Sequence, residues 1–165
     1  MRAFIALSLV CCLLALTGCS SYRPLYAKGP NGEGVSSLLS SVSVVEQTGR
    51  TGQLVRNELL NSMGSGPIRF SMKLMVTEKT IDVSTLSASN LRRKRFNLVV
   101  HYELQNLSSG NIVSSGESFS NVSFDTVRQP VADLQAASNA ASRAAQEVGQ
   151  DIRQRVAAYF ADHPN

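Results

Sequence analysis

The chain has 165 residues, a formal net charge of +4 at pH 7 and 43% hydrophobic residues. This length suits one domain with a buried core, and no run reaches the ~20 apolar residues that a membrane-spanning helix needs. All three cysteines, Cys11, Cys12 and Cys19, lie near the N-terminus, which excludes a disulfide or a cysteine-based metal site in the remainder of the chain.

The N-terminal segment has the pattern of a lipoprotein leader. A short apolar run, residues 3–16, follows Arg2 and ends in Leu-Thr-Gly-Cys at Cys19, as in a secretory signal peptide with small residues at the cut. A cysteine directly after the cut is the lipobox, where the thiol and the new amino terminus are acylated. We expect this covalent lipid on Cys19 and no other cofactor. Ser20 favours the periplasmic face of the outer membrane; the alternative is an ordinary signal peptide with an incidental cysteine.

Residues 20–37 are rich in glycine, serine and proline, a composition typical of a flexible tether. The predicted organisation is therefore a cleaved signal peptide at 1–18, a lipidated tether at 19–37 and a single α+β domain at 38–165.

The first half of the domain predicts a strand, a helix and a second strand. The β-branched run Leu38–Val45 indicates a strand. Helical spacing over Gly52–Met63, with Thr51 as N-cap and Gly64 at the end, predicts a helix. Strict alternation over Ile68–Thr77 predicts a half-buried strand, and its change of phase predicts a bulge or bend between Thr77 and Thr80.

The second half predicts a polar turn, two paired strands and a long helix. Leu86–Asn90 reads as the turn, Phe96–Leu104 and Ile112–Phe124 as strands, and Leu107–Asn111 as the hairpin between them. Pro130 to Phe160 predicts a helix. Its apolar stripe comprises Leu134, Ala137, Ala141, Ala144, Val148, Ile152, Val156 and Tyr159. The order β-α-β-β-β-α predicts an α+β two-layer sandwich, with a four-stranded mixed sheet and two helices packed on one face.

The chain carries few side chains suited to catalysis. His101 lies at a polar position of its strand, His163 is near the end of the sequence, and no serine stands in a Gly-x-Ser-x-Gly turn. No spacing of histidine, aspartate and glutamate predicts a metal site. We expect a protein that is not an enzyme.

A cluster of four cations, Arg92, Arg93, Lys94 and Arg95, is the strongest polar feature. At a loop-to-strand junction it could contact an anion, because arginine grips phosphate through two hydrogen bonds. The alternative is a solubilising strand end that discourages pairing with other chains. For an exported protein, a phosphorylated lipid or an acidic protein is a more plausible partner than nucleic acid.

The run Tyr22-Arg23-Pro24-Leu25-Tyr26 after the lipid cysteine resembles the alphaproteobacterial branch of the LptE family of lipopolysaccharide-assembly lipoproteins. The early strand, the arginine-rich junction and the closing Ala158-Tyr159-Phe160 helix are similar in outline. The resemblance implies a two-helix, four-stranded sandwich inside the outer-membrane β-barrel LptD. There it would plug the barrel, help it assemble and contact lipopolysaccharide.

Two other functions are compatible with the sequence. One is a structural lipoprotein subunit of a different periplasm-spanning transport or secretion complex. The other is a membrane-anchored hydrolase, which the scarcity of convergent ionisable groups disfavours.

Overall fold

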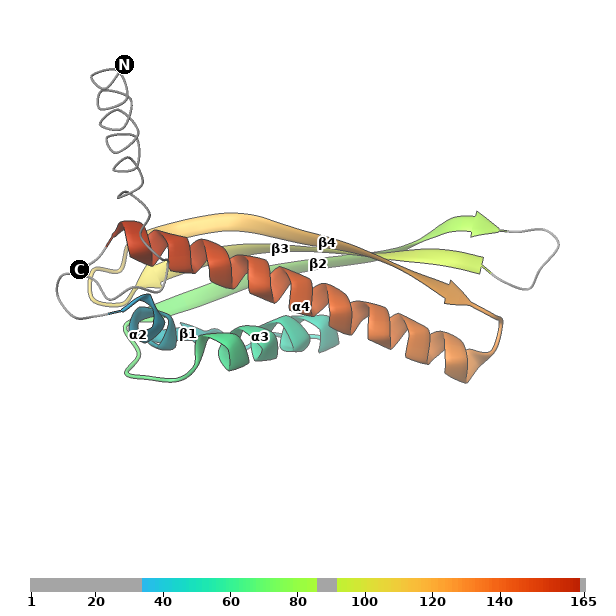
Figure 1. Cartoon of the computed structure of the whole chain (residues 1–165), viewed down its shortest axis with the longest axis horizontal. Helices are drawn as coiled ribbons and strands as arrows, with labels where there is room; N and C mark the ends of the chain where they lie inside the picture. The colour runs from blue at the N-terminus through green and yellow to red at the C-terminus, as the bar shows by residue number, and fades with distance from the viewer. Residues whose placement is uncertain (1–33, 86–91, 164–165) are drawn as a thin grey trace, which may run out of the picture.

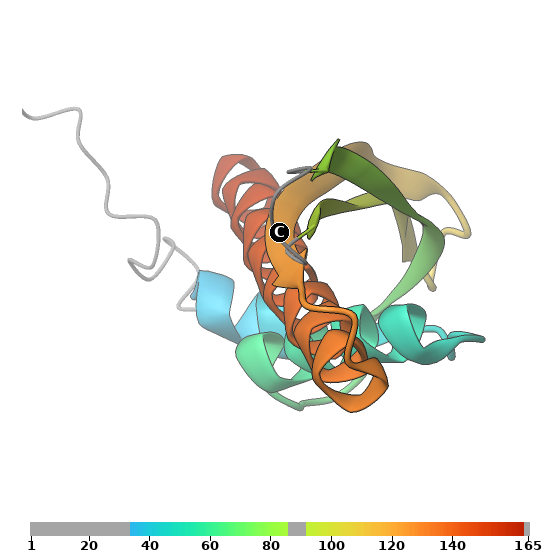
Figure 2. The same ribbon diagram turned by 90° about the vertical axis from the view of Figure 1, so that its right-hand side faces the viewer.

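The computed structural model describes residues 34–85 and 92–163. The elements are, in chain order, α2 (Val35–Ser40), β1 (Val42–Val44), α3 (Arg50–Met63), β2 (Phe70–Thr85), β3 (Arg92–Asn106), β4 (Ile112–Thr126) and α4 (Pro130–Asp162). The strands form one sheet in the order β1-β2-β3-β4, with β1 parallel to β2 and the other neighbours antiparallel. Three long strands run beside α4 in an elongated molecule (Figure 1), and the helices lie on one side of the curved sheet (Figure 2). The predicted α+β sandwich is confirmed, with α2 as an additional short helix.

The core lies between the helices and one face of the sheet, which we call the inner face; the opposite face is the outer face. Along β3, every second residue from Phe96 to Leu104 is buried. The alanine-rich middle of α4 allows a close approach to β4, whose inner face buries the small polar side chains Ser118 and Ser120. Phe160 fills the core near the end of α4, with its ring centroid 5.0 Å from that of Phe70.

The predicted first strand is wrong in its first half. Leu38 and Leu39 belong to α2, where they are buried together with Val35, and β1 begins only at Val42. Both a helix and a strand can bury so short an apolar run, so periodicity does not distinguish them. Helix α2 also begins inside the segment assigned to the tether. The remaining tether, the signal peptide and Cys19 lie outside the described residues.

Helix α3 begins slightly earlier than predicted. Gly49 precedes it with φ 87°, a left-handed conformation that favours glycine, and Thr51 is a buried helical residue rather than the N-cap. The helix ends at Met63, as predicted, and Gly64 follows with φ 82°. Val55 and Leu59 provide its fully buried contacts with the core.

Strand β2 is longer than predicted and is not interrupted between Thr77 and Thr80. It pairs with β3 without a break until a register shift between Asp82 and Ser84. Along β2 itself, the inner face is buried only as far as Val76, and the next four residues of the strand are exposed on both faces. Beyond Val76 the side chains of β2 do not pack against the core, so the alternation of apolar and polar residues there does not depend on which face is buried. The change of phase in the sequence therefore did not indicate a bend.

The hairpin between β3 and β4 is confirmed. Gly110 adopts φ 74°, and the Asn106 side chain accepts a hydrogen bond from the Ser108 backbone N–H at 2.9 Å. The strands are in register except for a shift between Leu104 and Gln105.

The predicted stripe on α4 is confirmed from Ala144 to Val156 and wrong at its start. Leu134 is 69% exposed, because the first turns of α4 diverge from the sheet (Figures 1 and 2). Within residues 34–85 and 92–163, no helix is both long and apolar enough to cross a membrane.

Candidate functional site

The basic cluster lies at one end of the long sheet. It forms the first four residues of β3 and not a loop, with Arg92 opposite Thr85 at the end of β2. The other end of β2 pairs with β1, the strand that follows α2 in the chain. The cluster is therefore separated from α2 by the length of β2 (Figure 1).

The strand alternation divides the cluster between the two faces of the sheet. Successive side chains of a strand point to opposite faces, and the buried residue Phe96 marks the inner parity. Arg92 and Lys94 therefore lie on the inner side, and Arg93 and Arg95 lie on the outer side. The four cations form two pairs on opposite faces, and not the single patch that their adjacency in the sequence suggests.

Two of the four cations are partly neutralised by carboxylates on neighbouring strands. Arg93 donates two hydrogen bonds to Asp125 of β4, from Nε at 2.9 Å and from Nη2 at 3.3 Å. This contact lowers the pKa of Asp125 and raises the pKa of Arg93. On the inner face, Lys94 Nζ lies 3.7 Å from Asp82 Oδ1.

Arg92 and Arg95 have no carboxylate partner among the described residues. Both side chains are exposed. They are the cations of the cluster best suited to meet an external anion, one on each face, because no neighbouring carboxylate competes for them.

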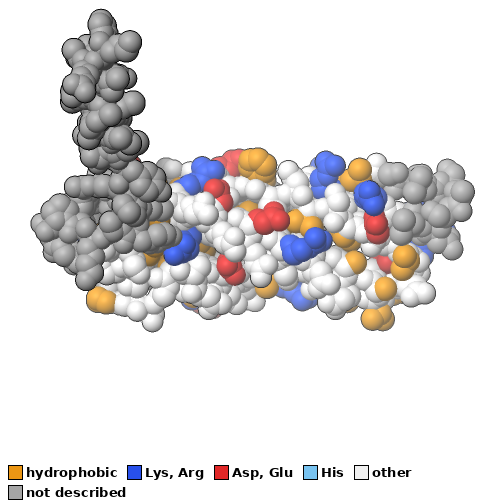
Figure 3. Space-filling view, viewed as in Figure 1, with side chains coloured by type: hydrophobic (Ala, Val, Ile, Leu, Met, Phe, Trp, Pro, Cys, Tyr) orange, Lys and Arg blue, Asp and Glu red, His pale blue; other side chains and the backbone are white. Residues whose placement is uncertain are grey.

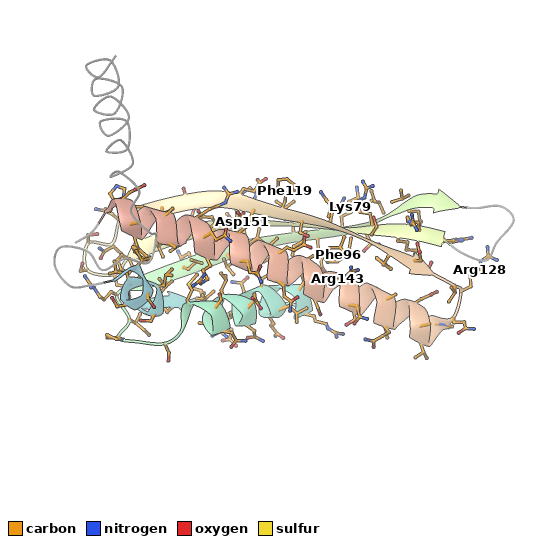
Figure 4. All side chains as sticks on the ribbon, viewed as in Figure 1. Lys79, Phe96, Phe119, Arg128, Arg143 and Asp151 are labelled. Carbon is orange, nitrogen blue, oxygen red and sulfur yellow. The ribbon has the colours of Figure 1, made fainter. Side chains whose placement is uncertain are left out.

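A hollow of about 570 Å³ lies next to the cluster, between β4 and the first half of α4. It is lined by Phe124, Asp125, Ala136, Asn139, Ser142 and Arg143. Figure 4 labels Arg143 on α4, the helix that forms one wall of this hollow. Asp125 thus lines the hollow and holds Arg93. The sequence contained no signal that Arg143 lies near the basic cluster, since almost fifty positions separate them along the chain.

The remaining ionisable pairs offer little chemistry. His101 Nε2 lies 3.2 Å from Glu117 Oε2 on the outer face, and both side chains are about half exposed. His163 stacks on Tyr159 with ring centroids 4.5 Å apart. Over the described ranges, no group of three or more histidine, cysteine, aspartate or glutamate side chains could hold a metal ion. The arrangement is suited to binding an anion at exposed arginines.

Replacing Asp125 with asparagine is expected to strengthen anion binding. The change removes the carboxylate that competes for Arg93, so affinity for vesicles containing a phosphorylated glycolipid should rise about two- to five-fold at pH 7, the range given by an exposed ion pair. Because the pKa of Asp125 is lowered, the wild-type pair persists at neutral pH. It is lost only as pH falls through that lowered pKa, and the variants should then converge.

Glu117→Gln is the matched control for this experiment. Glu117 lies on the same strand and the same face as Asp125 but is paired with His101, so its replacement should leave affinity unchanged at pH 7. Equal effects of the two substitutions would show that only the overall charge matters.

Comparison with solved structures finds the same fold in bacterial lipoproteins. A protein of Caulobacter crescentus, assigned as a lipoprotein, superimposes with a TM-score of 0.69 at 26% identity, over 79% of this chain and 98% of that chain. Rare lipoprotein B of Shewanella oneidensis has a TM-score of 0.55 at 14% identity, over 76% of this chain and 98% of the other. This chain shares its fold with bacterial lipoproteins.

A minor lipoprotein of Acinetobacter baumannii matches with a TM-score of 0.53 at 12% identity, over 71% of this chain and 88% of its own. At 12% and 14% identity, these two matches show the fold alone. No protein-family model matches the sequence, and no curated protein is significantly similar to it.

Proposed function

We propose that this chain is an outer-membrane lipoprotein, held at the periplasmic face by acyl chains on Cys19, that plugs an LptD-type β-barrel. In this role it helps the barrel to assemble and takes part in the delivery of lipopolysaccharide to the cell surface. The lipobox, the Arg-Pro-Leu-Tyr run and the fold shared with bacterial lipoproteins support the proposal. It includes no catalytic step.

The position of the basic strand end relative to α2 is the observation that carries the proposal. Strand β2 has 16 residues, which at ~3.3 Å per residue gives a length of ~50 Å. A bilayer with its headgroups is ~40–45 Å thick. A wedge of this length, tethered through the segment that precedes α2 and seated in a barrel, would carry Arg92 and Arg95 across the membrane towards the outer leaflet.

The face of the domain seen in Figure 3 is suited to a hydrated contact with a barrel interior. In Figure 3 cationic and anionic side chains are interleaved, and hydrophobic ones are scattered over a surface that is otherwise neither charged nor apolar. Surfaces of this composition form interfaces with many hydrogen bonds and bridging waters. They do not resemble the apolar surface of an obligate dimer.

Purification of the lipidated protein from its native envelope tests the partner. At endogenous expression, a large β-barrel protein should be recovered with it in stoichiometric amounts. Depletion of the chain should lower both the mature barrel and surface lipopolysaccharide. Normal amounts of both after depletion would contradict the proposal and leave a structural role in another complex.

Removing Arg92 and Arg95, the two arginines of the cluster without a carboxylate partner among the described residues, tests the lipid contact separately. The double variant Arg92→Gln with Arg95→Gln should lower affinity for purified lipopolysaccharide at least about tenfold, because a hydrogen bond to a charged group contributes ~1.5–3 kcal/mol. Recovery of the barrel should be unchanged.

The matched control for the arginine variant is Arg50→Gln with Arg155→Gln. It removes the same charge from α3 and α4, where Arg50 bonds Ser138 and Arg155 bonds Asp151. Its affinity for lipopolysaccharide should remain that of the wild type. Equal losses in both double variants would exclude a specific role for the strand end.

A further inference from the structure

The sheet ends in a long edge on the β2 side. Strand β1 pairs only with Phe70, Ser71 and Met72 of β2, and one further hydrogen bond joins Val45 N to Met72 O at 2.9 Å. Along the rest of β2, no described strand lies on this side. From Leu74 onwards, β2 therefore has a paired neighbour only in β3.

The backbone groups that face this edge can be assigned from the hydrogen bonds to the β1 side. The Phe70 N–H donates to Ser41 O at 3.2 Å, and Met72 O accepts from Val45, so even-numbered residues face away from β3. The N–H and C=O of one residue point to the same side of a strand, and the sides alternate along it. The free edge is thus formed by Leu74, Val76, Glu78, Thr80 and Asp82, up to the register shift.

A hollow of about 360 Å³ lies where the free edge begins. Its lining includes Val45, Lys73 and Met75. After β1 the chain no longer runs beside β2 but turns into α3, and this change of direction leaves the hollow next to β2. Met75 is 59% exposed beside it. An apolar side chain entering here would contact Val45 and Met75.

The charges along the edge differ between the two faces. Lys73 and Lys79 lie on the outer face, and Glu78 and Asp82 lie on the inner face, beyond the cover of the helices. Figure 4 shows Lys79 pointing away from α4. A strand placed along this edge would meet opposite charges if it carried acidic residues on its outer face and basic residues on its inner face.

We propose that the free edge of β2 binds an extended strand of a partner protein by β-strand addition. Main-chain hydrogen bonds to Val76, Glu78 and Thr80 supply the affinity, as in other complexes of this type. An apolar side chain in the hollow and the two-faced charge pattern select the sequence. Exposed edges of this length are usually blocked, and the guest strand is the occupant that this edge fits. The inference does not depend on the β-barrel proposal.

A synthetic peptide tests the edge in the full lipidated chain in detergent. The probe is about ten residues long to match the edge, with aspartate on one face, arginine on the other and leucine at one end. It should bind saturably. Amide hydrogen exchange at Val76, Glu78 and Thr80 should slow at least about tenfold, while the amides bonded to β3 change little.

Two matched controls remove only the main-chain contacts. The same peptide with N-methylated backbone should not bind. Thr80→Pro removes one edge-facing N–H, which an edge strand tolerates, and should abolish protection, whereas Thr80→Val should preserve it. If Thr80→Pro fails to fold, the N-methylated peptide still tests whether binding requires main-chain hydrogen bonds.

Three results would overturn the proposal. The first is an absence of saturable binding of the peptide, and the second is protection confined to other strands. The third is edge protection that rises with protein concentration without peptide, which would make a second copy of the chain the occupant.

Discussion

Replacing Cys19 with serine is expected to release the mature domain from the membrane. Each buried lipid methylene contributes ~0.8 kcal/mol of membrane affinity, and two acyl chains already give stable anchoring. Serine cannot form the thioether, and the described part of the chain has no membrane-spanning helix. Fractionation should find the mature wild-type domain in the membrane and the mature variant domain only in the soluble fraction. Mass spectrometry of the N-terminal peptide should detect acyl chains only in the wild type.

Cys12→Ser is the matched control for the anchor. Cys12 lies in the apolar run that is predicted to leave with the signal peptide, so this variant should be processed, acylated and membrane-bound like the wild type. The lipoprotein interpretation would be refuted if the Cys19→Ser variant stayed in the membrane and the wild type had an unmodified amino terminus.

Replacing Phe160 with alanine is expected to cost about 3–5 kcal/mol of unfolding free energy, the range for deleting a buried aromatic ring. Phe160 is 2% exposed and packs against Phe70, so it joins the end of α4 to the start of β2. Urea unfolding of the purified chain should show a lower midpoint with a similar slope, and a lower Tm. A large fall in slope would instead indicate loss of two-state unfolding.

Phe119→Ala makes the same chemical change on the outer face, where Phe119 is 67% exposed. Figure 4 shows this side chain pointing away from α4. Surface substitutions usually change stability by less than ~0.5 kcal/mol, so this variant should unfold like the wild type. Equal destabilisation by both substitutions would mean that the outer face is packed in the isolated protein.

Local patterns predicted the longer elements wherever one face of the element is buried over several turns or residues, whereas the short helix α2 was misread as a strand. The alternation in Phe96–Leu104 and the spacing from Ala144 to Val156 both match buried faces. The same reasoning failed at Leu134 and at the Thr77–Thr80 segment, where elements extend beyond their packing partners. Side chains there carry no periodic constraint, so their pattern does not report structure.

The ion pair between Arg93 and Asp125 shows why register could not be obtained by counting from the hairpin. Next to the turn, Gln105 is opposite Ile112. Extending that register along the strands would place Phe124 opposite Arg93. The shift at Leu104 moves the partner by one residue, and a shift of one residue exchanges the two faces of the sheet. The register shift therefore brings Asp125, and not Phe124, opposite Arg93.

The sequence by itself determined the features that depend on neighbours along the chain: the lipobox at Cys19, the α+β order of elements, the hairpin and the helix from Pro130. Only the tertiary structure decided the features that depend on distant segments. These are the helical state of Leu38 and Leu39, the division of the basic cluster between two faces, the pairing of Arg93 and the free edge of β2. They depend on packing and strand register, which are contacts between residues far apart in the sequence, and local propensity does not specify such contacts.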